Sequence, residues 1–145
     1  MHYYQPMWTL VGGGLKDLAQ SGKPMSEVLP KKAEWIKDKV VTFDPDNNRV
    51  TTQEGHEIDY EFLVVAMGIQ LNYDRIKGLN EPLETPGVGS NYSVKHVDKT
   101  WKAIQEFKSG NALFTFPNTP IKCAGAPQKI MYITERILTQ VSDLP

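Results

Sequence analysis

The single cysteine of this chain, Cys123, is the side chain best suited to nucleophilic chemistry. It lies in the stretch FTFPNTPIKCAGAPQK (114–129), just ahead of a predicted helix. Free backbone N–H groups and the helix dipole favour an anion at such a place, and Lys122 and Lys129 add positive charge. A thiolate, the reactive form of cysteine, is therefore favoured. The alternative is a small buried hydrophobe, the usual fate of a lone cysteine, but a polar loop bounded by prolines rarely lies in a core.

The elements that must position this loop follow from the patterns on either side of it. Apolar residues recur at helical spacing from Val97 to Phe107, and Gly110 follows as a C-terminal cap. NALFTF (111–116) is typical of a buried strand, and a second helix begins near Pro127, because proline suits the first helical turn. The order helix, strand, loop, helix indicates an α/β layer architecture.

A β-rich segment lies further upstream. WIKDKVVTF (35–43), RVTT (49–52) and EIDYEFLVVAMG (57–68) contain many β-forming residues, and the turn clusters DPDNN and QEGH separate them. The third stretch ends in a continuous apolar run, which is typical of a parallel strand buried on both faces. The sequence therefore predicts a β-meander that leads into a buried strand.

The composition excludes several classes of function. A net charge of −1 gives no reason to expect nucleic acid as a partner. One cysteine excludes an internal disulfide framework, and three scattered histidines without ligand spacing make us expect no metal site. The longest apolar run, FLVVAMGI (62–69), is too short to span a bilayer. At 145 residues the chain has the length of one domain.

Residues 40–68 resemble a signature of flavoproteins built from two dinucleotide-binding domains. The pattern is V-V-x-x-D-P…V…G…I-D-Y-x-x-L-V-V-A-M-G. In that class, a small-residue turn after the buried strand lets the backbone approach the FAD pyrophosphate, a role that suits Gly68 because it has no side chain. Met67 stands where the class has threonine, so a hydroxyl contact is lost while a backbone contact is kept.

Four blocks resemble the mitochondrial-type sulfide:quinone oxidoreductase family: HYYQPMWTLVG, VVAMGIQLNYDRIKGL, GSNYSVKHVDKTWKAIQ and FTFPNTPIKCAGAPQKIMY. The match runs to about Glu135, and the last ten residues depart from it. The resemblance implies a FAD enzyme of the mitochondrial inner membrane that oxidises hydrogen sulfide and reduces ubiquinone. It also implies a persulfide on one of two redox cysteines, whose sulfane sulfur passes to a small acceptor such as glutathione or sulfite.

The family's functional residues carry over position by position. Cys123 matches the cysteine that holds the persulfide, and Gln5 and Val40 match contacts to FAD. Ala66 and Gly68 fall at the pyrophosphate turn.

Three features of the family are absent from this sequence: the G-x-G-x-x-G fingerprint, the second redox cysteine, and the C-terminal region that binds quinone and the membrane. We therefore expect an incomplete FAD/NAD(P)-binding Rossmann-like α/β architecture. Residues 1–110 would form a partial FAD-binding domain, and residues 111–145 the opening strand, loop and helix of a second dinucleotide-binding-like domain. Such a chain would be inactive alone and would retain little FAD.

Two other interpretations stay open. A NADH:quinone reductase of the same flavoprotein class would need no cysteine here and would carry G-x-G-x-x-G after residues 112–116, where PNTPIKCAGAP stands instead. A non-catalytic truncated isoform would at most bind a partner. An upstream fingerprint and a downstream cysteine in the flanking transcript would argue against that second interpretation.

Overall fold

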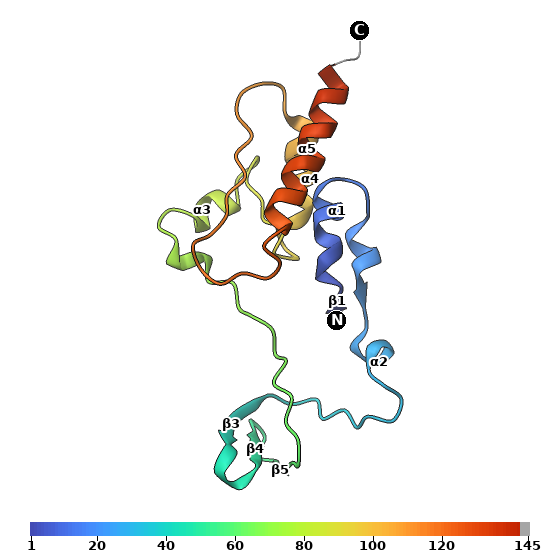
Figure 1. The fold of residues 1–145 in the computed structure, drawn as a ribbon, viewed down its shortest axis with the longest axis vertical. Coiled ribbons are helices and arrows are strands. Elements are labelled where there is room, and N and C mark those ends of the chain that lie inside the picture. The colour runs from blue at the N-terminus through green and yellow to red at the C-terminus, as the bar shows by residue number, and fades with distance from the viewer. Residues whose placement is uncertain (143–145) are drawn as a thin grey trace. The chain divides into compact units, whose positions relative to one another are not determined.

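The computed structural model describes residues 1–142, and the chain divides into two compact units. The helical unit comprises Met1–Glu27 and the chain from Leu71 onward, and the meander unit comprises Val28–Gln70. Figure 1 shows the helices of the first unit and the small sheet of the second. Each unit is described by itself.

The helical unit is built around a short helix, α1 (Trp8–Gly12), which contacts α4 (Val97–Glu106) and α5 (Ala126–Ser142). The 3-10 helix η1 (Gln5–Met7) leads directly into α1. Trp8, Val11 and Val97 form the buried core, and partly buried apolar side chains surround them: Tyr3, Met7, Leu18 and Val94. The predicted helices at 97–107 and from Pro127 are thus confirmed.

Glycines let α1 approach its two partner helices closely. A Cβ atom added to Gly13 would lie 2.4 Å from Cγ2 of Ile133 on α5, and one added to Gly14 would lie 2.5 Å from the ring of Trp101 on α4. Gly14 also has a φ of +69°, a left-handed conformation that ends the helix and suits glycine. The run Gly12–Gly14 therefore serves helix packing.

The remaining elements of the helical unit are short. Strand β1 (His2–Tyr3) pairs antiparallel with β2 (Gly22–Lys23), and the indole Nε1 of Trp8 donates to the Ser21 hydroxyl at 3.2 Å. The other short elements are η2 (Leu18–Ser21), α2 (Met25–Val28, at the boundary between the units), η4 (Tyr73–Arg75) and α3 (Asn80–Leu83).

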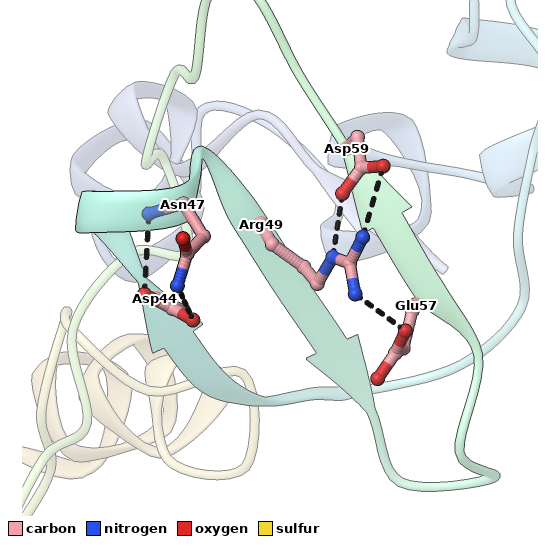
Figure 2. Close-up of polar contacts among 5 residues, drawn as sticks. All are labelled: Asp44, Asn47, Arg49, Glu57 and Asp59. Carbon is pink, nitrogen blue, oxygen red and sulfur yellow. Dashed lines mark hydrogen bonds and ion pairs between the residues drawn. The ribbon is translucent and has the colours of Figure 1, made fainter.

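The meander unit holds an antiparallel sheet in the order β3 (Val40–Asp44), β4 (Arg49–Thr52) and β5 (Glu57–Asp59). The 3-10 helix η3 (Pro45–Asn47) joins β3 to β4. The carboxylate of Asp44 accepts from the Asn47 amide nitrogens, at 3.3 Å from the backbone and 2.8 Å from the side chain (Figure 2). The turn predicted at DPDNN is therefore confirmed.

Arg49 fixes the register between β4 and β5. Its guanidinium lies 2.6 Å from Oδ1 of Asp59 and 2.7 Å from Oε2 of Glu57, as Figure 2 shows. Arg49 faces Asp59 directly in the strand register, and Thr51 faces Glu57. Because all three side chains are exposed, these ion pairs contribute little to stability, and they specify pairing more than they stabilise it.

Two predicted strands are not formed. The strand expected over residues 57–68 ends at Asp59, and residues 61–70 are exposed and have no hydrogen-bond partner among the described residues. The stretch 111–116 is likewise exposed and irregular. A strand needs a neighbour for its backbone groups, and within residues 1–142 nothing pairs with either stretch. None of the helices in this range has the length and apolar character needed to cross a bilayer.

Candidate functional site

Cys123 lies on an irregular loop three residues before α5, and its side chain is exposed. The predicted position ahead of a helix is confirmed. Its backbone carbonyl accepts from the Ala126 N–H at 3.0 Å, which joins the loop to the first turn of α5. Its φ is +56°, a left-handed conformation that costs a non-glycine residue about 1–2 kcal/mol. Other contacts must therefore hold this residue in place.

Two long-range contacts hold the loop, and both meet at Lys122. The hydroxyl of Tyr92 donates to the carbonyl of Lys122 at 2.8 Å and lies 3.4 Å from the carbonyl of Cys123. The ammonium of Lys122 donates to Oε1 of Gln5, at the start of η1. The structure thus brings the loop of Cys123 together with Gln5, a second residue singled out from the sequence.

The electrostatics of this cluster follow from partial burial. Burial raises the pKa of Tyr92, and the charge of the nearby Cys123 thiolate raises it further. Burial lowers the pKa of Lys122. Tyr92 and Lys122 are half-buried, while Cys123 and Gln5 are exposed. The cluster therefore combines an accessible sulfur with less accessible groups that hold its backbone.

Sequence reasoning did not identify Tyr92. Thirty positions separate it from Lys122 and 117 separate Lys122 from Gln5, so no local spacing could indicate these contacts. Only the resemblance pointed to Gln5, and only its charge pointed to Lys122.

The other predicted flavin contacts, Val40, Ala66 and Gly68, belong to the meander unit. Val40 begins β3 and is half-buried. Ala66 and Gly68 lie in the exposed stretch after β5. Gly68 has a φ of +79°, and a Cβ atom placed there would meet nothing within 4 Å. Glycine is therefore favoured here by its backbone conformation, and contact of these residues with FAD stays a prediction.

A separate cluster in the meander unit contains side chains of metal-ligating type. Asp38, Glu54 and His56 place their ligand atoms within 4.8 Å of one another. Oδ2 of Asp38 accepts from the Glu54 backbone N–H at 2.9 Å, and it lies 3.8 Å from Nδ1 of His56. A hydrogen bond from Thr52 and then the one from Glu54 lower the pKa of Asp38. Through these contacts Asp38 holds the turn between β4 and β5 in place.

Comparison with known proteins first defines the fold class of the chain. No protein-family model matches the chain. Its structure is similar to the crystal structure of the sulfide:quinone oxidoreductase from the hyperthermophilic bacterium Aquifex aeolicus, with a TM-score of 0.52 and 31% identity over 72% of this chain and 23% of that one. The expected class, an incomplete Rossmann-like α/β architecture of the FAD-binding type, is therefore confirmed.

The particular family follows from the curated relatives. The mitochondrial sulfide:quinone oxidoreductase of Mus musculus is 56% identical over 144 residues, which are 99% of this chain and 32% of that protein. The protein of the same name from Dictyostelium discoideum is 50% identical over 138 residues, 94% of this chain and 30% of that protein. The resemblance to mitochondrial-type sulfide:quinone oxidoreductases is confirmed, and this chain spans about a third of the length of these relatives.

The alignments differ in how far they extend along the chain. The mouse alignment covers 99% of it and the Dictyostelium discoideum alignment 94%, and the departure expected after about Glu135 stays a prediction. Helix α5 continues through that point to Ser142. The last three residues of the predicted departure, 143–145, lie outside the described residues.

Proposed function

We propose that this chain is part of a FAD-dependent sulfide:quinone oxidoreductase of the mitochondrial inner membrane. The enzyme would take electrons from hydrogen sulfide and give them to ubiquinone. The observation that carries the proposal is Cys123, exposed ahead of α5 in a chain that is 56% identical to the mouse protein over 144 residues.

Cys123 would carry the sulfur. Hydrosulfide attacks the Cys123 sulfur of a disulfide formed with a second cysteine. A new S–S bond makes a persulfide on Cys123, the old S–S bond breaks, and the second cysteine leaves as a thiolate with the electron pair. The sulfane sulfur then passes to a small acceptor such as glutathione or sulfite. Because Cys123 is the only cysteine of these 145 residues, this chain does not complete the cycle alone.

FAD, when bound, would accept the electron pair released when the two cysteines re-form their disulfide, and it would supply this pair to the quinone. Gln5, Val40, Ala66 and Gly68 are the residues that would hold it. Gly68 fits this role because open space surrounds the place where a Cβ atom would be, so its backbone is free to meet a phosphate. Gln5 fits because its Nε2 has no hydrogen-bond partner among residues 1–142. Without the fingerprint loop we expect weak FAD retention, measured as flavin absorbance after gel filtration.

The decisive experiment uses the mixed disulfide of Cys123 with glutathione, in which glutathione replaces the second cysteine. Hydrosulfide is added, the products are trapped by alkylation, and the peptide that carries Cys123 is weighed by mass spectrometry. Attack on the Cys123 sulfur releases glutathione and leaves a peptide heavier by one sulfur atom, which is the expected main product. A peptide that returns only as the free thiol contradicts the proposal. Cys123→Ser is the control and gives neither product.

A further inference from the structure

The loop around Cys123 is irregular, yet the backbone and the side chain of Lys122 both anchor it. Residues 117–125 form no helix or strand. The carbonyl of Lys122 accepts from Tyr92, and the ammonium of Lys122 donates to Gln5. The loop is therefore tied through its backbone to the segment before α4 and through its side chain to η1.

We propose that Tyr92 and Lys122 are positioning residues for Cys123, which together hold its left-handed backbone and present its sulfur at the surface. This inference rests on the proposed role of Cys123 and adds the residues that fix its geometry. Neither residue forms a hydrogen bond with the reacting sulfur, so both act through the backbone of the loop.

The geometry assigns a different part to each contact. A phenol has one hydrogen to donate, so the 2.8 Å contact of Tyr92 with the Lys122 carbonyl is the principal bond and the 3.4 Å contact with the Cys123 carbonyl is its weaker branch. The Lys122 ammonium provides a second tie, because Gln5 leads into α1, and α1 contacts α5. The tie thus connects the loop to η1, which leads into the packed helix α1.

The hydrogen bond from the Ala126 N–H to the Cys123 carbonyl, at 3.0 Å, reports on this arrangement. It joins Cys123, whose φ is +56°, to the first turn of α5. If the Tyr92 hydroxyl is removed, this strained residue relaxes more often, and the Ala126 amide exchanges faster with solvent. A hydrogen bond of this kind typically changes such an equilibrium by about two- to tenfold.

The test is amide hydrogen exchange at Ala126 in the 145-residue chain. Tyr92→Phe and Lys122→Met are each expected to raise the exchange rate about two- to tenfold, and Lys122→Arg is expected to restore the parent rate because it still donates to Gln5. The matched control is Thr85→Val, which deletes a hydroxyl that donates to the Pro82 carbonyl at 2.8 Å, a bond of the same kind and length that does not involve the Cys123 loop. An unchanged rate in Tyr92→Phe, or an equal rise in Thr85→Val, overturns the inference.

A second readout separates positioning of the cysteine from a general structural role. The phenol of Tyr92 senses the Cys123 thiolate, so Cys123→Ser is expected to lower the pKa of Tyr92. The measurement is the phenolate absorbance, taken as the difference from the same titration of Tyr92→Phe. No change in this pKa places the sulfur too far from Tyr92 and refutes the inference. Neither readout uses sulfide, so failure of the proposed reaction and failure of this inference are distinguishable.

Discussion

Gly14→Ala should destabilise the helical unit more than a glycine substitution normally does. The added methyl would lie 2.5 Å from the Cδ2 and Cε2 atoms of Trp101, which is too close for any Cβ contact. Forcing extra volume into a packed contact costs about 1–3 kcal/mol. The φ of +69° adds about 1–2 kcal/mol for a residue with a Cβ atom. We therefore expect the free energy of unfolding to fall by about 2–5 kcal/mol.

Gly78→Ala is the matched control for that prediction. Gly78 lies in the same unit with a φ of +77°, and a Cβ atom there would meet nothing within 4 Å. It should therefore lose only the backbone part, about 1–2 kcal/mol. Urea unfolding followed by circular dichroism gives both values by linear extrapolation. Equal losses in the two variants would refute the argument that the glycine run allows α1 and α4 to approach.

Three further predictions concern other parts of the chain. The hydrogen bond from Arg49 lowers the pKa of Asp59, so this carboxylate contributes stability that is present above the unfolded pKa and is lost as pH falls through the lower folded value. Arg49→Met should raise that pKa toward the ordinary value of an aspartate in an NMR titration, and an unchanged midpoint would contradict the ion pair. Val64 is 86% exposed in an unpaired apolar run, so Val64→Lys should reduce self-association in analytical ultracentrifugation while leaving the circular dichroism spectrum unchanged. Cys123→Ser should leave the free energy of unfolding within about 0.5 kcal/mol of the parent, because this side chain is exposed; a larger loss in urea unfolding would mean that the sulfur is part of the packing.

Local patterns predicted the helices and turns well because their hydrogen bonds are local. Helix α4 forms over Val97–Glu106 and α5 over Ala126–Ser142, close to where periodicity and Pro127 placed them. The same reasoning failed at residues 60–68 and 111–116. A continuous apolar run predicts a strand only if neighbouring strands accept its backbone groups, and none among residues 1–142 does so.

The candidate site shows the same difference between local features, which the sequence predicts, and non-local contacts, which it does not. Cys123 could be found from its residue type and its place before a helix, both of which are local features. The contacts that hold it are not local: Tyr92 reaches the loop across 30 positions, and Gln5 meets Lys122 across 117. The resemblance singled out Gln5 for FAD, whereas the structure adds its contact with the cysteine loop. Gln5 would therefore contact both FAD and the loop that carries Cys123.

The contact with Lys122 determines which atom of Gln5 is free. An ammonium group has donors only, so it pairs with Oε1 and leaves the Nε2 group to donate elsewhere. Gln5→Glu keeps an acceptor for Lys122 but removes that donor, whereas Gln5→Leu removes both. We expect Ala126 amide exchange to keep the parent rate in Gln5→Glu and to rise about two- to tenfold in Gln5→Leu. Equal rates in the two variants would mean that the Lys122 contact does not hold the loop. If the rates differ as expected, Gln5→Glu removes the N–H donor that Gln5 would offer to a flavin while it keeps the contact with Lys122 that holds the Cys123 loop.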